Sequence, residues 1–181
     1  MNSVSRSQRR SRRGFSLVEL VIVIVIIGVI AAIAIPRVGR AAKGAGESAL
    51  ASNLAIMRNV IELYSSQHDG VYPGANGDGV ALADTAAAFL TQLTQYTKAD
   101  GTVKATFDPA NGFKFGPYLR KGIPPAPVGP TKGDTNVLMD NTGPAVSAAN
   151  TSGWVYNSAT GDIIVNSDAA NESGDKTYDA Y

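Results

Sequence analysis

A long apolar run dominates the first part of the chain. From Leu20 to Ile35 the sequence holds no charged residue, and the apolar segment Phe15–Ile35 spans 21 residues. A helix of that length is about 31 Å long, which is enough to cross a bilayer core of about 30 Å. Val and Ile are poor helix formers in water, but in lipid every backbone group must be satisfied internally, which enforces a helix. The pattern therefore predicts a membrane-spanning helix.

Beyond this run the apolar positions become periodic. We expect one helix from about Phe15 to about Ser66, with a kink where Gly28 and Pro36 weaken it, since proline removes a backbone donor. The second half of this helix carries a stripe at steps of four and three residues, the spacing of one helix face: Leu50, Leu54, Met57, Ile61 and Tyr64.

The pattern of residues after the long helix predicts a small globular head. Asp84 or Thr85 can cap a second helix, with Lys98–Gly101 ending it. Two runs joined by a turn predict a β-hairpin, Trp154–Asn157 and Asp162–Asn166. Val137–Met139 is a further strand candidate, residues 122–134 form a proline-rich loop, and the polar tail from Asp168 is expected to pack poorly. The fold class is α+β: a long N-terminal hydrophobic helix packed by its C-terminal half on a small antiparallel β-sheet head.

Charge is unevenly distributed. Five arginines and no acidic residue precede Gly14, and the whole chain has a formal charge of +1. Residues 15–181 alone hold eleven basic and fifteen acidic side chains, a balance of −4, which argues against a dedicated nucleic-acid surface. The chain has no cysteine, which excludes disulfides, thiolate catalysis and thiolate metal sites. Arginines before the apolar run predict a cytoplasmic leader, with everything after Pro36 outside.

Residues 13–20 read RGFSLVEL, and this motif closely resembles the N-terminus of type IV prepilins and type II secretion pseudopilins. Residues 61–64 and 68–73, and motifs at 116–119, 153–156 and 160–163, look like the major pseudopilin subfamily. An ordinary secretory signal also has a basic start and an apolar core, but here the helical pattern continues beyond Ala34. Many type IV major pilins close a C-terminal loop with a disulfide, so the lack of cysteine favours the pseudopilin.

The resemblance implies processing at Gly14 and Phe15. A membrane peptidase and methyltransferase would cut between them and methylate the new amine of Phe15; the alternative is that Gly14 is only a flexible joint. Glu19 is costly in a membrane helix, by about 2.5–3.5 kcal/mol, and would pair with the Phe15 amine of a neighbouring subunit during assembly. Otherwise Glu19 simply reaches the lipid headgroups. Gly28 and Pro36 are either helix irregularities or flexibility used in filament packing.

The resemblance also implies the organisation and the partners. Residues 1–14 are the leader, 15–40 the transmembrane and filament-core helix, and 41–181 the periplasmic or extracellular head. The subunit would sit in the bacterial inner membrane and then polymerise through its N-terminal helix. Its partners would be an assembly platform with its ATPase and minor pseudopilins or pilins, with no nucleic acid. The expected function is a type II secretion pseudopilus subunit; alternatives are a type IV pilus pilin or a membrane-tethered binding module.

No catalytic set is visible, so an enzyme is not expected. His68 beside Asp69 has no partner at a telling spacing, which favours a loop or capping histidine. Major pseudopilins are also known for a structural calcium, which makes the acidic tail a candidate calcium site. The favoured alternative is that these residues form a solvated polar tail. The candidate ligands are Asp162, Asp168, Glu172, Asp175 and Asp179.

Overall fold

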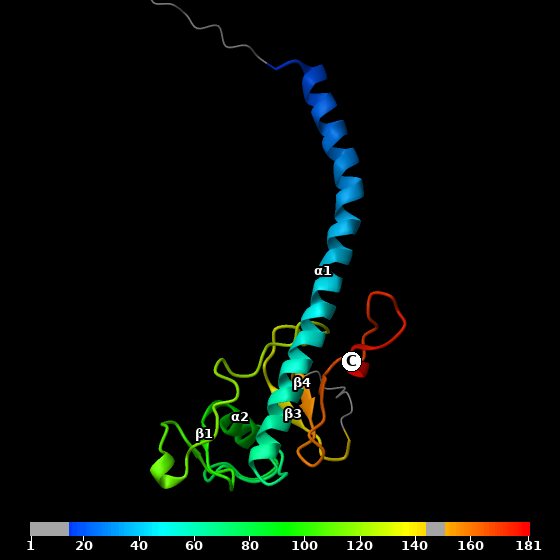
Figure 1. Ribbon diagram of the computed structural model, residues 1–181. Coiled ribbons are helices and arrows are strands. Elements are labelled where there is room, and N and C mark those ends of the chain that lie inside the picture. The colour runs from blue at the N-terminus through cyan, green and yellow to red at the C-terminus, as the bar shows by residue number, and fades with distance from the viewer. Residues whose placement is uncertain (1–14, 144–150) are drawn as a thin grey trace, which may run out of the picture. The chain divides into compact units, whose positions relative to one another are not determined.

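The computed structural model describes residues 15–143 and 151–181, and of residues 36–42 it describes the backbone alone. Contacts divide the chain into two units, Met1–Arg40 and Ala41–Tyr181. Helix α1 (Leu17–Gln67) begins in the first unit and ends in the second. Figure 1 shows the order of the elements along the chain.

The segment Leu17–Ile35 of the first unit is apolar apart from Glu19. Leu17–Ile35 has a mean hydropathy of 3.2 and none of it is buried. It is the one helix among the described residues that is long and apolar enough to cross a membrane. The assigned helix passes through Gly28 and Pro36 without interruption, and a Cβ added at Gly28 would meet nothing within 4 Å. The kink predicted at these two positions stays a prediction.

The second half of α1 packs against the rest of the head through one buried face. The five stripe residues from Leu50 to Tyr64 are at most 1% exposed, as the periodicity predicts. They pack into one core with Phe89 and Leu93 of α2 (Ala86–Thr94) and with the strand residues Trp154 and Tyr156. Thr85 caps α2, as predicted, by accepting a hydrogen bond from the Ala88 N–H at 3.2 Å.

A three-stranded sheet completes the core, in the order β3-β4-β5: β3 (Val137–Met139), β4 (Trp154–Tyr156) and β5 (Ile163–Val165). β4 and β5 pair antiparallel, which confirms the predicted hairpin. β3 and β4 pair parallel, so this sheet is mixed rather than purely antiparallel. The α+β class is confirmed. Trp154 is fully buried at the centre, and its indole N–H donates to the Pro124 carbonyl at 2.8 Å.

A second, two-stranded sheet lies beyond α2, formed by β1 (Tyr96–Thr97) and β2 (Val103–Lys104). Sequence reasoning took Lys98–Gly101 as the end of the second helix, but that helix ends at Thr94 and these residues form the turn of this hairpin. Gly101 has a φ of +87°, and a Cβ there would lie 2.8 Å from the Gln92 amide nitrogen. The turn therefore requires glycine.

The C-terminal tail is better packed than its polar composition predicts. Ala170 and Thr177 form a β-bridge, and Tyr178 is only 6% exposed and belongs to the core. Arg58 of α1 donates to the carbonyls of Ile163 and Tyr181 at 3.3 and 3.0 Å. The prediction of a poorly packed tail holds for 168–170 and 172–176, which are exposed, but not for Asn171 and Tyr178, which are buried.

Gln92 of α2 is a fully buried polar side chain. Its Oε1 accepts from the Gly74 N–H at 2.7 Å, and its Nε2 donates to the carbonyls of Asn76 and Gly101 at 3.2 and 3.1 Å. Buried backbone groups of loops must find such partners. Gln92 thereby joins α2 to the loop after α1 and to the β1–β2 turn.

Because residues 41–181 hold their own core, we expect a truncated chain beginning at Ala41 to be soluble and to unfold cooperatively. Calorimetry and far-UV circular dichroism measure this directly. Leu54→Ala in the truncated chain should cost about 2–5 kcal/mol, since Leu54 is fully buried. A gradual, non-cooperative melt would contradict the prediction.

Candidate functional site

The start of α1 is built as a capping box. The Ser16 N–H donates to the Glu19 Oε2 atom at 2.8 Å, and the Val18 N–H donates to the Ser16 hydroxyl oxygen at 3.3 Å. The Leu20 N–H closes the first helical turn on the Ser16 carbonyl at 3.2 Å. Ser-x-x-Glu supplies both bonds because the two side chains reach N–H donors that a helix start leaves unpaired, here those of Ser16 and Val18. From the sequence, Glu19 was expected either to pair with a neighbouring subunit during assembly or to reach the lipid headgroups. Its capping role was missed, although the S-x-x-E spacing signals it.

The carboxylate therefore has a defined position at the N-terminus of an apolar helix. A negative charge in the first turn is favoured by the helix dipole. One of the two carboxylate oxygens receives the Ser16 N–H, and a carboxylate can accept at both oxygens. The capping bond thus orients Glu19 while a second donor can still approach it.

The helix surface around this carboxylate is uncovered. Phe15 is 88% exposed and Leu17 77% exposed. From Leu17 to Ile35 no residue is buried by the rest of the chain. Exposed apolar area on this scale marks a surface that lipid or another protein covers.

The predicted processing site is only partly within the described residues. Phe15 and Glu19 are described, whereas Gly14 and the rest of the leader lie outside them. Cleavage between Gly14 and Phe15, methylation of Phe15 and pairing of Glu19 with a neighbour stay predictions.

Two of the five acidic tail residues, Asp162 and Asp175, accept local hydrogen bonds. Asp162 Oδ2 accepts from the Thr160 hydroxyl at 2.7 Å, and Asp175 Oδ1 accepts from the Ser173 hydroxyl at 2.6 Å and from Asn171. These bonds hold the pKa of Asp175 below its usual range. Asp168 and Glu172 are exposed, and Asp179 has one buried oxygen without a partner. Among the described residues no three His, Asp or Glu gather as a metal site, and calcium binding stays a prediction.

His68 ends α1 from inside the core. It is 1% exposed, its Nδ1 lies 2.7 Å from the Tyr64 carbonyl, and its Nε2 lies 2.9 Å from the Thr97 hydroxyl. This confirms the capping role, because the last carbonyls of a helix need donors. Its ring stacks on the Tyr64 ring with centroids 3.7 Å apart. His68 thereby connects the end of α1 to the β1–β2 hairpin.

Burial lowers the pKa of His68 below its ordinary value, against weaker opposing effects of the Tyr64 carbonyl and of Asp69 and Asp100. The unfolded chain then binds more protons below about pH 6.5, so we expect the free energy of unfolding to fall as the pH drops below that value. Urea midpoints at about pH 7.5 and pH 5.5 measure the effect, and the acid-dependent loss should shrink in His68→Gln. An equal loss in both proteins would assign it to other groups.

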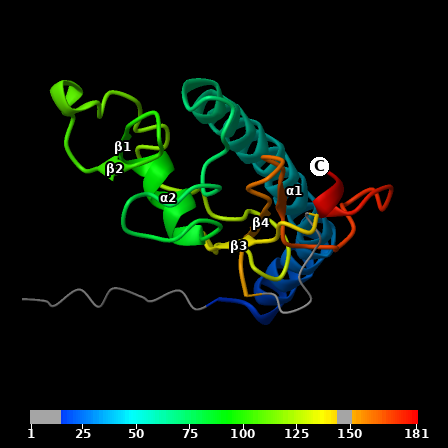
Figure 2. The ribbon, with the colours of Figure 1, turned by 90° about the horizontal axis from the view of Figure 1, so that it is seen from below.

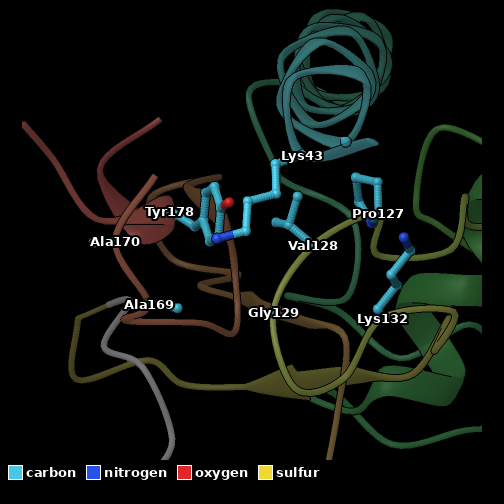
Figure 3. A pocket seen from close by; sticks show the side chains of 9 residues that line it. Lys43, Pro127, Val128, Gly129, Lys132, Ala169, Ala170 and Tyr178 are labelled. Atoms are coloured by element: carbon cyan, nitrogen blue, oxygen red, sulfur yellow. The ribbon is translucent and has the colours of Figure 1, made fainter. Parts of the chain in front are cut away.

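The head also contains a pocket of about 320 Å³ between α1, the Pro127–Gly129 loop and the C-terminal segment. Figure 3 shows the Lys43 side chain pointing toward Tyr178. The side chains that line it in the described part of the chain include Lys43 and Lys132 but no His, Asp or Glu. General acid–base catalysis needs groups that exchange a proton near neutral pH, and these lining residues supply no such pair.

Comparison with known proteins bears on the N-terminal segment. Residues 9–35 match the family model of the prokaryotic N-terminal methylation motif. The match covers four of the five leader arginines, the Gly14–Phe15 junction, Glu19 and the apolar run, and supports a prepilin-type N-terminus and a pilin-like subunit. No curated protein and no solved structure matches the chain.

Proposed function

We propose that this chain is the subunit of a pseudopilus in a type II secretion system. The observation that carries the proposal is the uncovered apolar helix Leu17–Ile35, headed by Glu19 and lying within a methylation motif. Such a helix requires either lipid or other helices around it, and a membrane followed by a filament core provides both in turn. The motif points to a structural subunit rather than an enzyme.

In this proposal Glu19 guides assembly. Removal of the leader creates an amine at Phe15, and a carboxylate in an apolar environment is strongly stabilised by an opposite charge within about 4–6 Å. The Glu19 of an incoming subunit would pair with the Phe15 amine of its neighbour. Because the Ser16 N–H already orients the carboxylate, less side-chain freedom is lost when the pair forms.

The finer assignment concerns the cellular system. The leader would be cytoplasmic and would be removed by the prepilin peptidase. The subunit would be anchored in the bacterial inner membrane with its head in the periplasm. An assembly platform and its ATPase would then add it to the filament. Filament growth would then push secreted proteins outward. The cysteine-free sequence supports a pseudopilin over a pilin that closes a loop with a disulfide.

Mass spectrometry of the protein from membranes and from sheared filaments tests the proposal. The expected N-terminus is Phe15, carrying one N-methyl group. A second arm removes either secretion genes or pilus retraction genes from the producing strain, and loss of filaments only with the former would assign the system. An intact leader in assembled material, or cleavage near Ala34, would refute the processing step.

A further inference from the structure

Charge in the head is segregated along the chain. Residues 96–121 contain five of the nine Lys and Arg of residues 41–181 but only two of their fourteen Asp and Glu, a net charge of +3. The rest of the head has a net charge of −8. Five of its acidic residues and a single lysine lie between Asp162 and Asp179.

Lys98 and Lys104 belong to the β1–β2 hairpin, and the Lys114 N–H donates to the Thr97 carbonyl of β1 at 3.2 Å; we call these three lysines the basic face. Tyr96 lies directly opposite Lys104 in the ladder, and Lys98 follows β1 at the start of the turn between the two strands. The ammonium groups of Lys98 and Lys104 lie 4.6 and 5.5 Å from the centre of the Phe113 ring. These lysines are therefore held together rather than spread over the head.

An exposed aromatic residue lies beside these lysines. Phe107 is 58% exposed and contacts Tyr96, with ring centroids 5.3 Å apart. The ammonium group of Lys114 lies 5.1 Å from the centre of the Phe115 ring. An aromatic anchor surrounded by charges is a common composition of protein interfaces.

The two charged parts lie on opposite sides of the head. In both Figure 1 and Figure 2 the β1–β2 hairpin lies on one side of the head portion of α1 and the C-terminal segment on the other. Parallel copies set side by side would therefore bring the basic face of one against the C-terminal segment of the next. Such a heterologous contact repeats without closing, as a filament requires.

We propose that the basic face docks on the acidic segment Asp162–Asp179 of a second copy of this chain. The inference rests on the proposed function, since it assumes parallel copies in a filament. Complementary charges of this kind fix register and exclude wrong partners. Nucleic acid fits less well, because the chain after Gly14 has a charge of −4.

Charge reversal tests the contact in the full chain. Lys98→Glu with Lys114→Glu should lower the yield of sheared filaments by about tenfold or more, because like charges would then face each other. Asp168→Lys with Glu172→Lys should do the same, and the four changes together should restore filaments. The matched control is Lys121→Glu with Lys132→Glu, which makes the same change in net charge at exposed side chains outside both the basic face and the acidic segment and should leave the yield unchanged.

Cross-linking gives an independent readout that a folding defect cannot imitate. The chain has no cysteine, so Lys114→Cys and Glu172→Cys together introduce the only two thiols. A short thiol cross-linker should convert filaments of this variant into a ladder of multimers, whereas each single variant should give no ladder.

The outcomes separate the two proposals. Filaments with neither cross-links nor charge dependence would overturn the docking inference and leave the proposed function standing. No filaments from the unchanged chain would refute both. If Lys98→Glu with Lys114→Glu abolished binding to a single-stranded oligonucleotide while filaments stayed normal, the basic face would be a nucleic-acid surface and the inference wrong.

Discussion

Glu19→Gln is expected to block filament assembly while leaving membrane insertion and leader removal intact. Glutamine can still accept the Ser16 N–H, which Glu19 receives at 2.8 Å, so the capping box survives. The charge, however, is lost, and the Phe15 amine of the neighbour would be left unpaired in an apolar core. Leaving one member of a buried ion pair alone costs about 3–5 kcal/mol, which corresponds to a loss of about 100-fold or more in assembly.

The measurement is the ratio of sheared filaments to processed subunit in the membrane. Ser16→Ala is the matched control, because it removes one capping hydrogen bond and keeps the carboxylate; we expect nearly normal filaments from it. Normal filaments from Glu19→Gln would show that assembly does not require the charge of Glu19. Equal loss in both variants would mean that the helix start, not the ion pair, limits assembly.

Gln92→Glu is expected to destabilise the head by about 3–5 kcal/mol at pH 7, because it places an uncompensated charge in the core. The change alters no heavy-atom shape, but it removes the two N–H donors that reach the carbonyls of Asn76 and Gly101 and puts a buried carboxylate against them. Burial raises the pKa of the introduced carboxyl. The deficit should therefore be largest at neutral pH and shrink as the pH falls toward about 4, where the group is protonated.

Urea unfolding of the chain beginning at Ala41, at several pH values, measures this deficit. Gln67→Glu is the control, since the Gln67 Oε1 accepts from the Tyr118 hydroxyl at 2.7 Å and a carboxylate can accept the same bond. We expect the control to cost little. A pH-independent loss in Gln92→Glu would contradict the role of the buried charge.

The parts of the fold visible in the sequence are those with long or repeated patterns. The helix was predicted within about two residues at each end, and all five stripe residues are buried. The strand candidates from Val137 to Asn166 were confirmed because apolar runs flank a clear turn. The parallel pairing of β3 with β4 depends on how a distant segment returns, which local patterns do not encode.

The missed features depend on tertiary contacts. Each strand of the β1–β2 hairpin is two residues long, so its pairing relies on Gly101 in the turn and on the buried Thr97 bound to His68. Tyr178 is buried only because the tail returns to the core. At the candidate site, Glu19 was singled out from its place at the head of an apolar run. Its capping bond was missed because Glu19 was interpreted only as a charge in a membrane helix, and the Ser-x-x-Glu capping pattern was not considered.

The position of Trp154 makes the head its own optical probe. It is the only tryptophan in the chain, it is fully buried, and its indole bonds to the Pro124 carbonyl. Emission excited near 295 nm therefore arises from a single site at the centre of the sheet, in membranes and in filaments alike. A red-shifted spectrum would report water at β4, and an unchanged one would show that subunits join as rigid bodies. Assembly can thus be followed in an unlabelled suspension, with the state of the head read at each step.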